Sequence, residues 1–143
     1  MSTATIYALW RGGAPERIAA IIFLCGYLAT VAFQSPMKDR FHNLELGVLL
    51  VDASILVVLI ILAVFANRYW TIWIAGFEII QTLSHLPRLL IPDLLPHTYA
   101  EMVSFWGYPM LVILAAGTYR HQDRLKQTGA DNAWSNLARP DQK

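Results

Sequence analysis

The segment from Leu44 to Ala66, which reads LELGVLLVDASILVVLIILAVFA, constrains this chain more than any other. Its only charged side chains are those of Glu45 and Asp52, and Ser54 is its only other polar residue. At a helical rise of about 1.5 Å per residue the segment is roughly 33 Å long, enough to cross the hydrocarbon core of a bilayer. A chain of 143 residues has too little other material to bury such a helix on all sides. The segment therefore predicts a helix covered by lipid and by other helices.

The composition favours the same class of protein. Hydrophobic residues make up 56% of the chain and charged residues 15%, whereas a soluble domain usually has about 45–50% and about 25%. The net charge of +1 gives no electrostatic reason to expect nucleic acid as a partner. The single cysteine, Cys25, lies within an apolar run, where we expect a small buried side chain.

Three further segments are apolar enough to join the first one in the membrane. The sequence predicts an all-α integral membrane bundle, residues 17–119, of four transmembrane helices at about 17–33, 44–66, 69–86 and 99–119. Only Asn67 and Arg68 separate the second helix from the third, so these two are expected to run antiparallel and adjacent. Residues 1–16 are expected to lie at the headgroup level as an interfacial segment, and residues 120–143 to form a polar cytoplasmic tail.

Prolines and glycines mark where these helices are interrupted. Pro87, Pro92 and Pro96 forbid one regular helix across the segment between the third and fourth spans. Gly107 and Pro109 predict a kink in the first half of the fourth span. Gly47 in the second span and Gly117 in the fourth are sites where two helices can approach closely.

The distribution of arginine and lysine predicts the orientation. Four spans place both termini on one side, and that side carries most of the basic residues: Arg11, Arg17, Arg68, Arg120, Arg124, Lys126, Arg139 and Lys143. The opposite side carries Lys38, Arg40 and Arg88. By the positive-inside rule both termini are expected to be cytoplasmic. The size and compactness of the chain favour the plasma (inner) membrane of a prokaryote.

The predicted spans contain polar residues that are costly in a bilayer. These form an intramembrane polar cluster: Glu45, Asp52, Glu78, Gln81, His85 and Arg88. The short turn at Asn67–Arg68 allows the second and third spans to be aligned, residue i lying level with about residue 135 minus i. On this alignment Glu45 lies near Arg88, and Asp52 lies between Gln81 and His85. Glu78 is then about 7 Å deeper than Asp52 and has no basic partner at its own depth.

Two interpretations of the cluster remain open. The structural one is that polar pairs hold the register of two helices in lipid, where each pair contributes about 0.6 kcal/mol. The functional one is a proton or ion site, because intramembrane acids close to a histidine are typical of proton relays.

A third set of side chains is expected near the outer boundary. It contains possible metal ligands: His42, His85, His97 and Glu101, with Glu45 and Asp93 beside them. Their spacing matches no compact motif for zinc or copper(II), so we predict no metal and no cofactor. His121, near the inner end of the fourth span, is expected to interact with the helix dipole.

No catalytic template occurs in the chain, and we predict that it is not an enzyme. Its size and the lack of a soluble domain favour a non-catalytic accessory or assembly subunit of a larger membrane complex, whose partners are lipid and either other subunits or a second copy. The first alternative is a small proton or ion conductor or transporter that uses Asp52, Glu78 and His85. The second is a membrane protein that binds metal on the periplasmic side.

Overall fold

The computed structural model describes residues 2–34, 44–91, 95–129, 131, 133 and 134. The described part is helical, apart from an isolated antiparallel bridge between Ala66 and Trp134. Its helices are α1 Ser2–Arg11, α2 Ala14–Phe33, α3 Leu46–Phe65, α4 Tyr69–Leu83, α5 Leu86–Leu90, α6 Pro96–Phe105 and α7 Gly107–Thr128.

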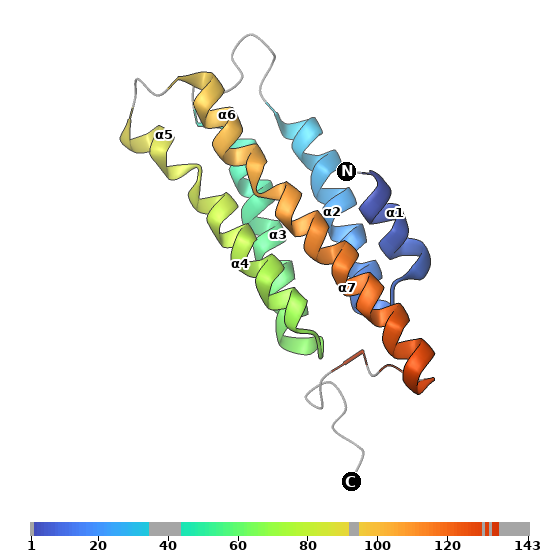
Figure 1. Ribbon diagram of the computed structural model, residues 1–143. Coiled ribbons are helices and arrows are strands. Elements are labelled where there is room, and N and C mark those ends of the chain that lie inside the picture. The colour runs from blue at the N-terminus through green and yellow to red at the C-terminus, as the bar shows by residue number, and fades with distance from the viewer. Residues whose placement is uncertain (1, 35–43, 92–94, 130, 132, 135–143) are drawn as a thin grey trace.

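The long helices lie side by side as a bundle (Figure 1). Helices α3 and α4 are packed against each other as the short turn predicts, α2 packs on α3, and α7 packs on α4. The N-terminal segment, expected at the headgroup level, forms α1, which runs alongside α2 and packs on α2 and α7. Ala8 of α1 is fully buried in this contact.

Among the described residues, three helical stretches are long and apolar enough to cross a membrane, namely Ala14–Phe33, Leu46–Phe65 and Pro96–Thr128. Helix α4 is not one of them, because its 15 residues cover only about 22 Å. It ends at Leu83 rather than at residue 86, and the short helix α5 follows after a turn. Pro87 explains the break, since proline is tolerated in the first turn of a helix but not in its interior.

The last predicted span, 99–119, is longer and divided in the structure. Helix α6 begins with Pro96 in its first turn, and α7 follows it after a break at Trp106. The break lies beside Gly107 and Pro109, where the sequence predicted an irregularity, and Pro109 has no N–H to offer the carbonyl of Phe105. The indole N–H of Trp106 donates to Ser84 Oγ (3.2 Å), which holds the break against the end of α4.

The helix of the last predicted span does not end at residue 119 but includes residues 120–128 of the expected tail. Helix α7 continues to Thr128 and stops at Gly129, whose φ of 71° is the left-handed conformation that ends many helices. The N–H of Gly129 donates to the carbonyl of Leu125 and completes the last turn.

The core is apolar and built from small and large side chains of α1, α2, α3, α4 and α7. Its fully buried members include Ala19, Ala20, Leu59, Ile74 and Leu114. Many other large apolar side chains are exposed on the outside of α2, α3 and α7, as expected of helices that face lipid. Cys25 is one of the exposed residues, so the expectation that it is buried is wrong.

Two glycines allow helices to approach as the sequence predicts. A Cβ atom on Gly47 would lie 2.5 Å from the carbonyl oxygen of Phe33, so α3 could not pass α2 at this distance with a larger residue. A Cβ atom on Gly117 would lie 2.9 Å from the indole ring of Trp70, where α7 meets α4.

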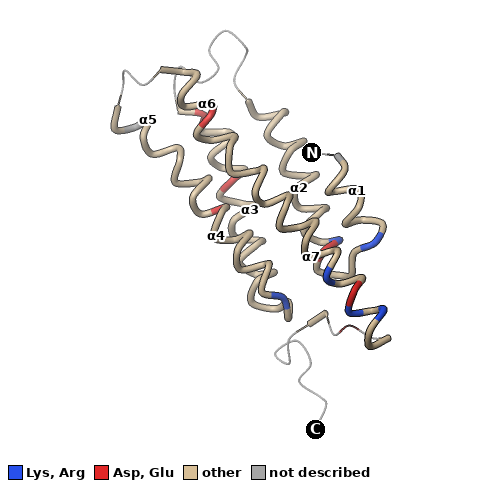
Figure 2. The backbone as a smooth tube through the Cα atoms, in the orientation of Figure 1, with Lys and Arg blue, Asp and Glu red and all other residues tan. Residues whose placement is uncertain are grey.

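Most of the described arginine and lysine residues gather at the end of the bundle where α4 begins and α7 ends (Figure 2). The start of α2 lies at this same end, so the structure groups the basic residues there as the sequence analysis did. The acidic residues in the middle of the bundle have no basic residue beside them in this view.

Candidate functional site

A chain of buried hydrogen bonds crosses the bundle away from the basic end. The Nε2 atom of His85 lies 3.1 Å from Oδ2 of Asp52, and the Nδ1 atom lies 2.7 Å from the Tyr99 hydroxyl oxygen. Asp52 comes from α3, His85 from the turn between α4 and α5, and Tyr99 from α6. All three residues are at most 2% exposed.

One tautomer of His85 satisfies all of these contacts. The backbone N–H of Glu45 donates to the Tyr99 oxygen (3.4 Å), and the Tyr99 hydroxyl can donate its own proton to His85 Nδ1. A neutral histidine that accepts at Nδ1 donates from Nε2, and Asp52 is the acceptor there. Each hydrogen bond in this series therefore has one donor and one acceptor.

Glu78 lies beside this chain without a full set of partners. It is 1% exposed, and its Oε1 atom has no hydrogen-bond partner within the described part of the chain. The charge of Asp52 acts on the Glu78 carboxyl group, so the two groups are close enough to interact. A buried carboxylate without compensating partners is costly, so this side chain needs either a proton or a positively charged ligand.

Asp52 and Glu78 line the same cavity, which has a volume of about 380 Å³. Helices α2, α3, α4, α6 and α7 all contribute to its walls. Gln81, Thr30, Gln34 and Ser104 are further polar residues there, whereas Phe23, Ile55 and Met110 represent the apolar part of the lining. An apolar cavity with a few convergent polar groups is the usual form of a small-molecule site.

The structure brings together part of the predicted polar cluster. The predicted neighbour relation between Asp52 and His85 is confirmed by their 3.1 Å contact, and Gln81 lies on the cavity wall. Glu45 stands at the start of α3 and Arg88 in α5, and the charges of both act on the Tyr99 hydroxyl. Tyr99 was not predicted as a member of the cluster, because the position of its hydroxyl group depends on the path of the backbone after α5.

The possible metal ligands are not assembled into one site by the described residues. His97 and Glu101 pair with each other on the surface (3.2 Å) with side chains that are 83% and 69% exposed, whereas His85 is buried. His42 and Asp93 lie outside the described residues. Over residues 2–34, 44–91 and 95–129 no three His, Cys, Asp or Glu side chains are placed to hold a metal.

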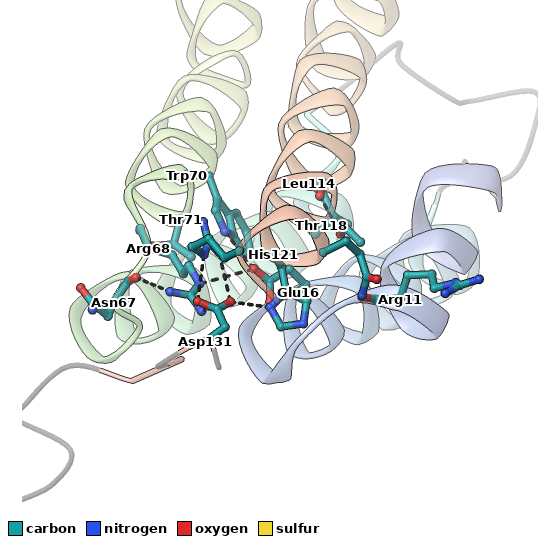
Figure 3. A network of polar contacts seen from close by, with 12 residues as sticks. Arg11, Glu16, Asn67, Arg68, Trp70, Thr71, Leu114, Thr118, His121 and Asp131 are labelled. Carbon is teal, nitrogen blue, oxygen red and sulfur yellow. Dashed lines mark hydrogen bonds and ion pairs between the residues drawn. The ribbon is translucent and has the colours of Figure 1, made fainter. Parts of the chain in front are cut away.

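A second buried polar network lies at the basic end, and the sequence analysis missed it (Figure 3). The Nη2 atom of Arg68 lies 2.6 Å from Asp131, which also accepts from Arg124 (2.8 Å). His121 Nδ1 lies 2.5 Å from the same carboxylate. The indole N–H of Trp70 donates to Glu16 (3.2 Å), and Arg68 lies 3.6 Å from that carboxylate.

This network has charges of both signs in direct contact, so it fits a structural role. Two arginines face two carboxylates, and the acid at the start of α2 is also favourable to the helix dipole. Burial by itself raises the pKa of Asp131, but the hydrogen bonds from Arg124 and His121 and the charge of Arg68 outweigh it. The pKa of Asp131 is therefore held below its ordinary value of 3.8.

The role expected for His121 is corrected by this network. Because α7 extends to Thr128, His121 is not at the end of its helix but in a buried position against Asp131. The positions of Glu16 and Arg68 at the same end of neighbouring spans were a signal that the two could pair. Asp131 gave no such signal, since it follows Gly129 in a polar segment.

Comparisons of the chain with protein-family models, with curated protein sequences and with solved structures gave no significant match.

Proposed function

We propose that this protein is a small multi-pass membrane transporter that moves protons through the site formed by Asp52, Glu78 and His85. The observation that carries the proposal is the buried Glu78 carboxyl with an unpartnered oxygen, in one cavity with an Asp52 that is bonded to His85. This is the function that the sequence analysis held as its first alternative.

The proposal places four spans in the bilayer. These are α2, α3, α4 together with α5, and α6 together with α7, with both termini cytoplasmic. Support comes from the length of the three long stretches and from the basic residues gathered at one end of the bundle. The plasma membrane of a prokaryote is the proposed location.

The chain from Tyr99 through His85 to Asp52 supports a route by which protons reach the cavity. Each link is at most 3.1 Å long, and the histidine can accept a proton at one nitrogen while it releases one from the other. Tyr99 belongs to α6, which lies at the end of the bundle opposite to the start of α4 (Figure 1), so the route leads inward from the α6 end.

The core below the cavity supports a transporter rather than an open pore. The buried side chains of Leu59 and Leu62 follow Asp52 along α3, and Ile74 comes between Arg68 and Glu78 along α4, so apolar core residues separate the cavity from the network around Arg68. Protons need water or polar groups to move, and a dry apolar layer blocks them. Release toward the basic end would therefore require the helices to rearrange, as in alternating access.

The role of an accessory or assembly subunit also remains a proposal. The exposed apolar side chains of α2 and α3 are compatible with a partner subunit, but they are equally compatible with lipid. No contact within the described residues favours the subunit over the transporter.

Proton movement into vesicles tests the proposal. The full chain is reconstituted into liposomes that contain a pH-sensitive dye, and pH gradients are imposed alone and together with opposing Na⁺ or K⁺ gradients. We expect protein-dependent proton movement, and a loss of about tenfold or more in the Glu78→Gln and Asp52→Asn variants, since acid–base groups contribute about 10²–10⁴-fold.

The matched control is Glu101→Gln, which removes an acid from the same half of the molecule but from its exposed surface. This variant is expected to move protons at the wild-type rate. Equal rates in protein-containing and empty vesicles under every gradient would contradict the proposal, as would wild-type rates in both cavity variants.

A further inference from the structure

We propose that the acidic cavity binds an amphipathic organic cation, that is, a ligand with one ammonium-type charge on an apolar or aromatic body. The inference rests on the proposed function in one respect, since it names the class of molecule that exchanges with protons at the same site.

The charge of the cavity selects for a cation. Two carboxyl groups, those of Asp52 and Glu78, line it, and none of the described lining residues is basic. Asp52 already has His85 as a partner, whereas Oε1 of Glu78 has no hydrogen-bond partner among the residues that the structure describes. A bound cation would satisfy that oxygen and remove the cost of burying an ionised carboxylate.

The size and lining of the cavity favour an organic ligand over a metal ion. A volume of about 380 Å³ lies in the range of about 300–1,000 Å³ that is typical of small-molecule pockets. A dehydrated Mg²⁺ or Ca²⁺ needs six or more oxygen ligands at about 2.0–2.6 Å, and most of this lining is apolar. The apolar walls instead match the hydrocarbon part of an amphipathic molecule.

Aromatic rings near the carboxyl groups add a second attraction. Phe23, Tyr27 and Tyr108 line the cavity, and an aromatic face attracts an ammonium group by about 0.5–2 kcal/mol. Tyr27 and Tyr108 are also 52% and 69% exposed, so the cavity reaches the outer face of the bundle between α2 and α7. In a bilayer this opening faces lipid, where amphipathic cations accumulate.

A proton and an organic cation would compete for the same carboxyl group. When a permanent cation occupies the cavity, Glu78 can remain ionised, and when the cavity is empty a proton neutralises it. Binding of the organic cation should therefore release protons and should weaken as the pH falls. This competition is the property that would couple the two movements in a transporter.

The test compares two probes of almost the same shape. Benzyltrimethylammonium carries a permanent positive charge, and neopentylbenzene is its neutral counterpart with carbon in place of nitrogen. Binding of each to the purified full chain in mild detergent is measured by isothermal titration calorimetry. We expect benzyltrimethylammonium to bind at least about tenfold more tightly than neopentylbenzene, with tighter binding at high pH.

Three variants locate the binding. Glu78→Gln is expected to weaken binding of benzyltrimethylammonium at least about tenfold, and Tyr108→Ala, which changes an exposed side chain and should leave the fold intact, by a few-fold. Glu101→Gln is the control and should bind as the wild type does. Circular dichroism and gel filtration establish that each variant is folded.

Several results would overturn the inference. Equal binding of the neutral probe would show an apolar site with no charge selection. Displacement of benzyltrimethylammonium by millimolar Na⁺ or K⁺, with heat of binding for those ions, would show an inorganic cation site. Unchanged affinity in both Glu78→Gln and Tyr108→Ala would place the binding elsewhere.

The binding test and the vesicle test fail independently. Proton movement without binding of the charged probe would overturn this inference and leave the proposed transporter standing. Charge-selective binding without any proton movement would overturn the proposed transporter and leave the cation site standing.

Discussion

The Nε2 atom of His85 lies 3.1 Å from Oδ2 of Asp52, which ties the end of α4 to the middle of α3 in the buried part of the bundle. A second histidine–carboxylate pair of similar length, between His97 and Glu101 (3.2 Å), lies on the surface. Both pairs join an imidazole to a carboxylate, but only the first is buried. Variants of the two pairs therefore show how burial changes the contribution of such a contact to stability.

Replacement of His85 by Ala should destabilise the protein, and the matched His97→Ala change should not. The first leaves a buried carboxylate oxygen of Asp52 without its partner, which costs about 1–3 kcal/mol. The second changes an exposed pair, for which effects within about 0.5 kcal/mol are usual. Thermal unfolding in detergent, followed by circular dichroism, measures both. Equal loss in the two variants would show that burial does not set the strength of these pairs.

Replacement of Tyr99 by Phe should remove the outer link of the hydrogen-bonded chain and keep the ring. The backbone N–H of Glu45 and the Nδ1 atom of His85 would each lose a partner in a buried site. We expect a loss of about 1–3 kcal/mol in stability and slower proton movement into vesicles. Tyr69→Phe, which removes an exposed hydroxyl at the other end, is the control. Wild-type proton movement in Tyr99→Phe would show that protons do not use this link.

The contact between Asp52 and His85 was predictable because a turn of only three residues, 66–68, separates α3 from α4. A short turn determines which residues of two antiparallel helices lie at the same depth. Polar side chains at the same depth, such as those of Asp52 and His85, are then expected to contact each other. The position of Tyr99 cannot be predicted in this way, because residues 86–98 separate it from His85 and contain three prolines. The cavity could not be predicted either, because α2 and α7 form part of its wall and the alignment of α3 with α4 does not place those helices.

The basic end shows a different limit of sequence reasoning. Arg68 was interpreted only as part of the charge bias between the two sides, yet it is nearly buried and contacts Asp131. Its partner follows a left-handed glycine at the end of α7, and the direction of the chain after such a residue is set by tertiary contacts. The length of α4 was also overestimated, because hydropathy continues past Leu83 while the backbone turns there ahead of Pro87.

Replacement of Gly117 by Ala should destabilise the contact between α7 and α4. The new Cβ atom would lie 2.9 Å from the indole of Trp70, whose N–H is bonded to Glu16. Overpacking of this kind costs about 1–3 kcal/mol. The control is Gly76→Ala in α4, where no atom lies within 4 Å of the new Cβ and helix propensity alone predicts a gain of up to about 1 kcal/mol. A stabilised Gly117→Ala variant, measured by thermal unfolding, would contradict the packing described here.

Acidification should release the segment that carries Asp131 and Trp134 from the basic end. The carboxylate of Asp131 holds Arg68, Arg124 and His121, and these partners keep its pKa below 3.8. A group whose pKa is lower in the folded state contributes stability above its ordinary pKa and loses it as the pH falls through the lowered value. The contacts should therefore be intact from neutral pH to about pH 4 and be lost below it.

Fluorescence of Trp134 reports this release, because Trp134 forms a backbone bridge with Ala66. Next to it, the carbonyl of Ala133 accepts a hydrogen bond from the backbone N–H of Asn67. The signal is obtained as the difference between the protein and its Trp134→Phe variant across the pH range. In Asp131→Asn the segment should be released at every pH, since breaking a buried ion pair costs about 3–5 kcal/mol. Asp123→Asn, which changes an exposed acid of α7 outside the network, should keep the wild-type transition. An acid transition that remains in Asp131→Asn would show that another group is responsible for it. Glu16 would then be replaced next, because it is the other buried carboxylate of this network.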